Sequence, residues 1–300
     1  MNSISGAKLY SWYQQAKQSA LANNIDPDEV DWLLQVITNL SNLSIRLGSY
    51  ANQSFIVSQR PLWKIEELWQ RRLQERVPVQ YLVNTVFWRR FQLRVTPAVL
   101  IPRPETELII DIAIEAAGQN KNSLIADVKQ HWVDLGTGSG AIALGLASSL
   151  PQATIHAVDY SPEALGVAQE NAEQLNLNQN ICFYQGSWWQ PLEFLQGQVR
   201  GMVSNPPYIP TSQISQLQPE VANHEPHLAL DGGIDGLNDI RHLVQVAPHY
   251  LISGGIWLIE IMAGQHHAVV KLLEQQEKYY DIKIFPDLSG IERFVLAHRR

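Results

Sequence analysis

The feature that most constrains the fold is a glycine-rich loop that joins an apolar strand to a helix. Residues 132–135 (WVDL) form a short buried strand, residues 136–140 (GTGSG) follow directly, and residues 141–150 have the composition of a buried helix. Glycines at alternate positions let the backbone turn sharply and let a ligand approach without a Cβ in the way. A strand, a tight loop and a helix in this order are typical of a βα unit in a parallel sheet.

The same alternation of strand and helix continues to the end of the chain. We expect strands at residues 154–159, 181–184, 201–204 and 255–261, helices at residues 161–175 and 239–250, and a terminal strand pair at residues 280–287 and 293–298. Repeated βα units build a parallel sheet with helices on both faces. Ligands of such sheets bind beyond the carboxyl ends of the strands. The expected fold class is therefore α/β and Rossmann-like.

Two other patterns precede this region, so we expect three parts. Residues 1–77 are predicted to be a helical domain for recognition or packing, because apolar residues recur at three- and four-residue steps and no strand pattern is present. Residues 78–98 are predicted to be a β-hairpin linker, since alternating and aromatic residues follow Pro78. Residues 99–300 form the domain that carries the chemistry.

Two acids at strand ends indicate the ligand of the glycine loop. The loop glycines are spaced G-x-G-x-G, whereas the dinucleotide fingerprint is G-x-G-x-x-G. Asp134 stands just before the loop, where an acid would repel a pyrophosphate and suits a cationic ligand. Asp159 lies nineteen residues after Gly140, where a carboxylate can accept hydrogen bonds from two ribose hydroxyls. These features favour S-adenosylmethionine over a dinucleotide.

A tryptophan completes the expected cofactor site. Trp188 follows the strand at residues 181–184, and an indole offers a large face on which an adenine ring can stack. Core packing is the alternative, and we expect it for one residue of the Trp188–Trp189 pair. The predicted cofactor-binding residues are Asp134, Gly136, Thr137, Gly138, Ser139, Gly140, Asp159, Trp188 and Asn205.

A rigid turn of Asn205, Pro206, Pro207 and Tyr208 follows the strand at residues 201–204. The prolines fix φ, remove two backbone donors and push Asn205 into an extended shape. The Asn205 side-chain oxygen and the Pro206 carbonyl can then accept both hydrogens of a planar NH₂ group. Such positioning lets a weakly nucleophilic nitrogen face a cofactor methyl without a strong base. We expect these four residues to be catalytic and substrate-binding, with Tyr208 packing on the planar group.

Composition narrows the class of partner. The net charge is -7, which lowers the odds of a protein that holds nucleic acid through its phosphates. The single cysteine, Cys182, cannot form an internal disulfide, which fits a reducing compartment. We see neither a leader pattern nor an apolar run that could span a bilayer. His224 and His227 lack further residues with metal-ligand spacing. We therefore expect a cytoplasmic monomer without metal, membrane or stable nucleic-acid partner.

Four blocks of the sequence are distinctive: residues 99–107 (VLIPRPETE), 134–140 (DLGTGSG), 202–210 (MVSNPPYIP) and 224–233 (HEPHLALDGG). Together they resemble the HemK/PrmC family of protein-(glutamine-N5) methyltransferases. The resemblance implies a class I methyltransferase domain with a seven-stranded, mostly parallel sheet, joined by a hairpin to a helical N-terminal domain. It also implies S-adenosylmethionine as cofactor. The implied substrate is the glutamine of the Gly-Gly-Gln motif in class I peptide chain release factors, which act in translation termination.

Several charged residues around these blocks have two interpretations. Arg103 and Glu225 are expected to border the substrate; the alternatives are a salt-bridged helix start for Arg103, as for Glu105 and Glu107, and a backbone cap for Glu225. Glu260 ends a strand and is expected near the site, without touching the substrate. Ser187 stands where many members of the family have an acid, so a contact with the adenine amino group is not expected there.

Two other functions stay open. A nucleic-acid amino-methyltransferase, acting on adenine N6 or guanine N2, would use the same Asn-Pro-Pro-Tyr turn, but the negative net charge counts against it. A non-catalytic binding module would keep the fold, but the intact glycine loop and the intact turn count against that function.

Overall fold

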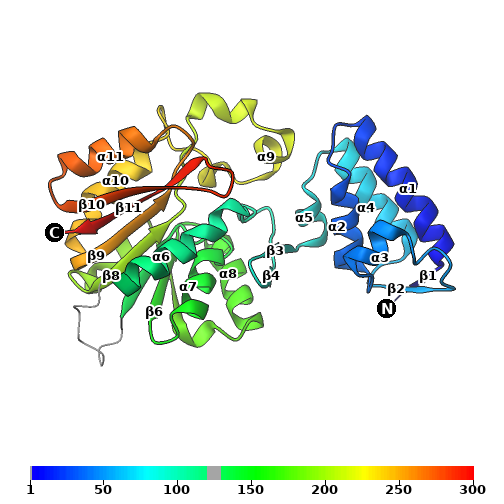
Figure 1. The fold of residues 1–300 in the computed structure, drawn as a ribbon, viewed down its shortest axis with the longest axis horizontal. Helices are drawn as coiled ribbons and strands as arrows, with labels where there is room; N and C mark the ends of the chain where they lie inside the picture. The colour runs from blue at the N-terminus through cyan, green and yellow to red at the C-terminus, as the bar shows by residue number, and fades with distance from the viewer. Residues whose placement is uncertain (1, 120–129) are drawn as a thin grey trace. The chain divides into compact units, whose positions relative to one another are not determined.

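The computed structural model describes residues 2–119 and 130–300, which form two compact units. The first unit comprises the chain up to Thr85 together with Gln218–His224, and the second comprises Val86–Leu217 and Glu225–Arg300 (Figure 1). Within the described residues, no helix is long and apolar enough to cross a membrane.

The first unit is a small helical body. Its elements are β1 (Asn2–Ile4), α1 (Gly6–Ala22), α2 (Asp28–Ile37), α3 (Asn42–Leu47), β2 (Ile56–Ser58), α4 (Leu62–Gln74), α5 (Val79–Val83) and α9 (Pro219–His224). Apolar faces of α1, α2 and α4 meet in a core that includes Leu9, Leu33 and Trp69. The expectation of a part without strands is wrong, because β1 and β2 pair antiparallel. Strands of three residues are too short to give a readable alternation.

Helix α9 joins the first unit although it is distant in sequence. Arg72 is buried and donates to both carboxylate oxygens of Glu29, at 2.6 and 2.7 Å, and to Glu220 of α9 at 2.7 Å. Arg76 also lies 2.7 Å from Glu220. Burial of a guanidinium requires such paired acceptors, so α9 is held by ion pairs that the sequence pattern did not indicate.

The predicted hairpin is shorter than residues 78–98. Residues 79–83 form helix α5, and only β3 (Val86–Trp88) and β4 (Phe91–Leu93) pair antiparallel. We expected a strand from Val79, but Pro78 is the N-cap residue of α5, with φ -51° and ψ 135°. Its fixed φ is compatible with the start of a helix. Asn84 ends α5 in the left-handed conformation, with φ 53°, which asparagine tolerates better than most residues.

The second unit is built on a seven-stranded sheet of order β10-β11-β9-β8-β5-β6-β7, which confirms the predicted fold class. The strands are β5 (His131–Leu135), β6 (Thr154–Asp159), β7 (Ile181–Gln185), β8 (Val199–Ser204), β9 (Leu251–Glu260), β10 (Tyr279–Pro286) and β11 (Glu292–Arg299). Strands β5 to β9 pair parallel with one another, and β11 pairs antiparallel with both β9 and β10.

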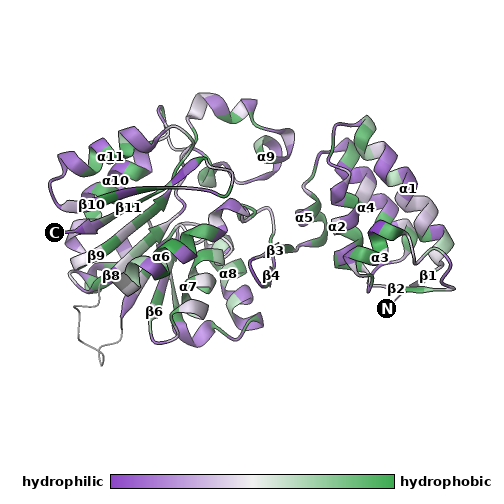
Figure 2. Ribbon diagram, viewed as in Figure 1, coloured by the Kyte–Doolittle hydropathy of each residue, from purple (hydrophilic) through white to green (hydrophobic). Residues whose placement is uncertain are grey.

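Helices cover both faces of this sheet. Figure 1 shows α6 (Leu108–Gln119), α7 (Ala141–Ser149) and α8 (Pro162–Gln174) on one face and α10 (Asn238–Val246) and α11 (His266–Gln275) on the other. The central strands are hydrophobic along their length (Figure 2) because both of their faces are covered. Trp257 and Met202, neighbours in the pairing of β9 with β8, are fully buried.

The strand order places a ligand crevice. Strand β5 has β8 on one side and β6 on the other, so the chain reverses its direction of winding at β5. A crevice opens at such a switch point, beyond the carboxyl ends of the strands. Here those ends are Leu135, Asp159 and Ser204, and the predicted site residues follow each of them.

Candidate methyl-transfer site

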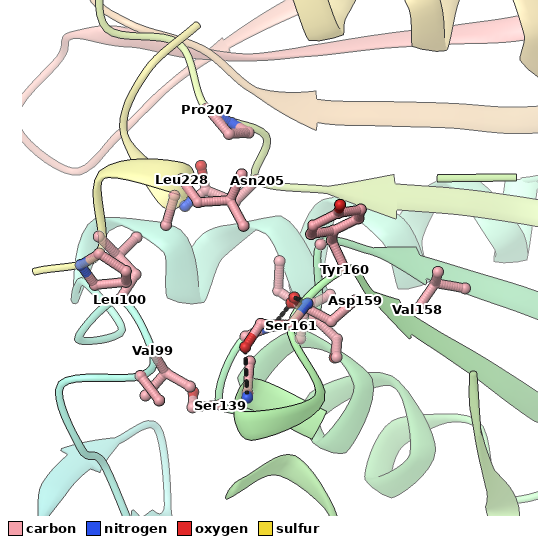
Figure 3. A pocket seen from close by; sticks show the side chains of 18 of the residues that line it. Val99, Leu100, Ser139, Val158, Asp159, Tyr160, Ser161, Asn205, Pro207 and Leu228 are labelled. Carbon is pink, nitrogen blue, oxygen red and sulfur yellow. Dashed lines mark hydrogen bonds between the residues drawn. The ribbon is translucent and has the colours of Figure 1, made fainter. Parts of the chain in front are cut away.

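A cavity of about 570 Å³ opens at this switch point. All of its walls belong to the second unit. Figure 3 shows side chains from the glycine loop, the end of β6 and the Asn-Pro-Pro-Tyr turn around the same space. The predicted site residues that line it are Gly136, Thr137, Gly138, Ser139, Asp159, Trp188, Asn205 and Pro207. Gly140, Asp134, Arg103, Glu225, Pro206 and Tyr208 are not among the lining residues.

The glycine loop has the conformation that its sequence requires. Gly138 has φ 54°, a left-handed value that a side chain would strain, and an added Cβ would meet nothing within 4 Å. The backbone N–H groups of Gly136 and Thr137 both donate to the carbonyl of Val158, at 2.9 Å. The loop is therefore fixed to the end of β6, and its open side faces the cavity.

Asp134 lies on the buried side of the glycine loop and holds it by hydrogen bonds. It is fully buried, and its Oδ2 accepts hydrogen bonds from the Thr137 hydroxyl at 2.6 Å and the Ala143 backbone at 2.9 Å. Burial raises the pKa of Asp134 to about 7. We expected this acid to face a cationic ligand directly; the structure instead places it under the loop, because its backbone and hydroxyl partners hold it there.

Asp159 reaches the cavity at the end of β6. Its Oδ2 accepts from the Gly138 backbone at 2.8 Å, and its Oδ1 accepts from the Ser161 backbone at 2.9 Å (Figure 3). Burial raises the pKa of Asp159, and the backbone hydrogen bonds oppose that rise. The Tyr160 backbone N–H also donates to this carboxylate, which leaves it lone-pair capacity for one ligand hydroxyl.

The two tryptophans have separate environments. An added Cβ on Gly136 would meet the Trp188 indole at 3.5 Å, so this ring lies against the glycine loop and lines the cavity. Its N–H donates to Asp239, whose pKa is raised by burial. Trp189 is buried and stacks on Tyr250, with ring centroids 4.3 Å apart. The expectation that one residue of the pair packs in the core is therefore confirmed for Trp189.

The Asn-Pro-Pro-Tyr turn presents its first residue to the cavity. Asn205 and Pro207 line the cavity, whereas Pro206 is buried. We expected the Tyr208 ring to face the substrate, but Tyr208 is not among the residues that line the cavity. Its hydroxyl donates to Glu260 at 3.1 Å. Burial raises the pKa of Tyr208, and the adjacent Glu260 adds to the rise, so the phenol keeps its proton.

A second buried hydrogen bond reaches Glu260 from the other side of the site. The hydroxyl of Thr106 donates to Glu260 Oε2 at 2.6 Å, and the side-chain N–H of Asn205 donates to the same hydroxyl at 3.4 Å. Thr106 lines the cavity and is buried. Its neighbours Glu105 and Glu107 stand out in the sequence and Thr106 does not, because a charge at a helix start is a stronger signal than a hydroxyl.

A loop after the turn holds the turn's backbone. The side chain of Gln265 donates to the carbonyls of Tyr208, at 3.0 Å, and Gly236, at 3.3 Å. Gly236 has φ 74°, and an added Cβ would overlap the Tyr208 carbonyl oxygen. An added Cβ on Gly232 would lie 2.8 Å from the Pro207 carbonyl oxygen. The glycines of the block at residues 224–233 and just after it thus allow close approach to the turn.

Arg103 and Glu225 form an ion pair beside the cavity. A guanidinium nitrogen of Arg103 lies 2.6 Å from Glu225 Oε1, and the Ile101 backbone N–H also donates to Glu225. Burial raises the pKa of Glu225, and Arg103 opposes the rise. The ion pair of Arg103 and the backbone contact of Glu225 thus follow the two alternative interpretations. Neither residue lines the cavity, and contact with the substrate stays a prediction. His224 bonds the Glu75 carbonyl, and the described residues contain no group of three metal-ligating side chains.

Comparison with known families agrees with this geometry. A family model described as a methyltransferase domain matches residues 126–228, which include the glycine loop, Asp159 and the Asn-Pro-Pro-Tyr turn. In solved structures, the hMettl16 catalytic domain in complex with the MAT2A 3'UTR hairpin 6 matches with a TM-score of 0.53 and 15% identity, over 69% of this chain and 74% of that chain. The likeness concerns the fold. Fold and cavity thus define a Rossmann-like methyltransferase.

Curated relatives narrow the class. The release factor glutamine methyltransferase of Synechocystis sp. is 52% identical over 98% of this chain and 97% of its own length. Those of Thermosynechococcus vestitus and Gloeobacter violaceus are 46% and 42% identical, and each comparison covers at least 96% of both chains. The chain belongs to the release factor glutamine methyltransferase family.

Proposed function

We propose that this chain transfers a methyl group from S-adenosylmethionine to the side-chain amide nitrogen of a glutamine, within the Gly-Gly-Gln motif of class I peptide chain release factors. Membership of the family supports the substrate. The observation that carries the chemistry is that Asn205 and the glycine loop line one cavity. In this proposal Asn205, which would bind the planar amide, lies beside the glycine loop, which would bind the adenosyl group.

The cavity residues fit S-adenosylmethionine. Gly138 leaves open space toward the ligand, Trp188 offers a ring for the adenine, and Asp159 keeps lone-pair capacity for a ribose hydroxyl. When bound, S-adenosylmethionine would supply a methyl group on a sulfonium. The acceptor nitrogen would take this methyl, the electron pair of the carbon–sulfur bond would stay on sulfur, and one proton of the nitrogen would go to water.

The turn supplies orientation. The Asn205 oxygen and the Pro206 carbonyl would accept the two N–H groups of the glutamine amide, which fixes the plane of the amide and returns electron density to its nitrogen. Effective positioning of this kind can account for a large part of a rate enhancement. Pro206 and Pro207 keep the turn rigid, so little reorganisation accompanies binding.

Transfer of radiolabel tests this function. The full chain is incubated with methyl-labelled S-adenosylmethionine and either a purified class I release factor or total RNA and DNA. We expect label in the release factor, and loss of that label when the glutamine of Gly-Gly-Gln is replaced by alanine. Label in nucleic acid alone would favour an amino-methyltransferase acting on bases and would overturn the proposal.

Asn205→Ala separates the roles of the turn and the loop. The variant should lose most of its turnover, about a hundredfold or more, because the amide loses an acceptor that orients it. Its affinity for S-adenosylmethionine by calorimetry should stay within about threefold of wild type, a difference of under 1 kcal/mol. A parallel collapse of cofactor affinity would mean that Asn205 serves mainly the cofactor.

A further inference from the structure

A chain of side-chain hydrogen bonds lies behind the Asn-Pro-Pro-Tyr turn. It runs from the Asn205 amide to the Thr106 hydroxyl, from that hydroxyl to Glu260, and from the Tyr208 hydroxyl to the other oxygen of Glu260. The three residues Thr106, Glu260 and Tyr208 are called here the Thr106–Glu260–Tyr208 relay. They come from the 3₁₀ turn before α6, the end of β9 and the turn itself.

The direction of each bond follows from the number of protons available. A hydroxyl has one proton to donate. The distance of 2.6 Å between Thr106 Oγ1 and Glu260 Oε2 is typical of a hydroxyl that donates to a carboxylate. With Glu260 ionised, the proton of Thr106 is used in that bond, so the Thr106 oxygen accepts from Asn205. The Asn205 group that faces Thr106 must therefore be the NH₂ group.

This fixes the polarity of the Asn205 amide. In a planar amide the oxygen points away from the NH₂ group, so Oδ1 is left for the cavity that Asn205 lines. Within residues 2–119 and 130–300, the bond to Thr106 is the one hydrogen bond of the Asn205 side chain. If the amide turned over, an NH₂ group would face the NH₂ group of the substrate, and both would be donors.

We propose that Thr106 and Glu260 are positioning residues, which hold the Asn205 oxygen toward the acceptor amide through this relay. The proposal rests on the proposed function, because it assigns the Asn205 oxygen to the glutamine. The bond from Asn205 to Thr106, at 3.4 Å, is longer than usual, so the hydroxyl selects the orientation without clamping the side chain.

The surroundings of Glu260 suit a fixed acceptor. Glu260 is 1% exposed, and Thr106 and Tyr208 donate to its two oxygens. Arg293 opposes the rise that burial causes in the pKa of Glu260, and Glu105 adds to it. The Tyr208 hydroxyl donates to Oε1 of Glu260, so Oε2 stays available to accept from Thr106.

Thr106→Val and Thr106→Ser test the relay. Valine keeps the shape of threonine but removes the hydroxyl, so the amide loses its orientation; we expect kcat on a class I release factor to fall about tenfold to a hundredfold. Serine keeps the hydroxyl and should restore kcat to within about threefold of wild type. The control is Thr154→Val, a buried threonine at the amino end of β6, away from the cavity, which should keep wild-type turnover.

Two further readouts separate positioning from folding. The affinity for S-adenosylhomocysteine by calorimetry should be unchanged in Thr106→Val, because the cofactor residues are intact. Glu260→Leu removes the acceptor of the Thr106 proton and should lower kcat as well. The double variant with Thr106→Val should be no slower than the slower single variant, since both changes break one chain.

The proposal is overturned if Thr106→Val keeps wild-type turnover, if Thr106→Ser is as slow as Thr106→Val, or if the two single effects multiply in the double variant. Failure of the proposed function would be seen elsewhere, as a wild-type chain that leaves the release factor unlabelled or an Asn205→Ala variant that stays active. If the loss of turnover came only from folding, the urea midpoints of Thr106→Val and Thr106→Ser would both fall, and this result would also contradict the proposal.

Discussion

A guanidinium nitrogen of Arg103 lies 2.6 Å from Glu225 Oε1, and the segments around both residues line the same cavity. The Glu225 side chain is 1% exposed and that of Arg103 is 32% exposed. The pair thus joins the wall that contains Leu100 and Pro102 to the wall that contains Leu228.

Arg103→Ala should weaken both the fold and substrate binding. Removing one partner of a buried pair leaves an uncompensated charge; because Arg103 is partly exposed, we expect a loss of about 2 kcal/mol, below the range for fully buried pairs. The KM for the release factor should rise as the walls separate. The matched control is Arg103→Met with Glu225→Leu, which removes both charges and should be less destabilised in urea than Arg103→Ala. Equal destabilisation would contradict this account.

Gly236→Ala should displace the Asn-Pro-Pro-Tyr turn. An added Cβ would overlap the Tyr208 carbonyl oxygen, so the turn must move, and we expect a loss above about 3 kcal/mol in stability together with reduced turnover. Gly264→Ala is the matched control, since Gly264 has a similar φ of 88° and open space for a Cβ. It should lose only about 1–2 kcal/mol to backbone strain and keep its activity. Urea unfolding and release-factor labelling measure both, and similar effects at the two positions would rule out the proposed contact.

Trp188→Ala and Trp189→Ala should separate cofactor binding from folding. Trp188 lines the cavity, and stacking of a base on an aromatic ring contributes about 1–3 kcal/mol, so affinity for S-adenosylmethionine should fall about tenfold to a hundredfold. Trp189 is buried in the core, and its loss should destabilise the fold by about 3–5 kcal/mol. Calorimetry and urea unfolding distinguish the two; a cofactor defect in the folded Trp189 variant alone would reverse the assignment.

Asp134→Asn should change how stability depends on pH. Burial raises the pKa of Asp134 from 3.8 to about 7, so the folded wild type binds a proton that the unfolded chain has already lost between these pH values. Wild-type stability therefore falls as pH rises through this window, by at most about 4 kcal/mol at 1.36 kcal/mol per pH unit. Asparagine does not titrate, so the variant should gain on wild type from pH 4 to pH 8. Urea unfolding at several pH values would refute this if the difference stayed constant.

Sequence patterns located the loop and the turn because their signals are local. Gly138 lies in the loop after β5, Asp159 ends β6, which is the next strand, and Asn205 directly follows β8. Thr106 and Glu260 are 154 residues apart, and no spacing rule brings them together. The position of Asp134 under the loop also depends on packing, because an acid before a glycine loop can face either way until the helix that follows is in place.

The small elements were predicted least well for the same reason. Residues 79–83 have an apolar pattern that fits a strand or a helix, and the structure selects the helix α5. Strands β1 and β2 gain their hydrogen bonds from each other across most of the first unit, so neither is visible in its own three residues.

The position of α9 limits how the two units could be exchanged between genes. Residues 218–224 fold with the first unit while both neighbouring stretches fold with the second, so the polypeptide passes between the units at residues 85–86, 217–218 and 224–225. A gene cut at residue 86 would encode every residue that lines the cavity, but Glu220 would lose Arg72 and Arg76. The residues of the two units thus alternate along the sequence, so neither unit could have been added or removed as a single continuous segment.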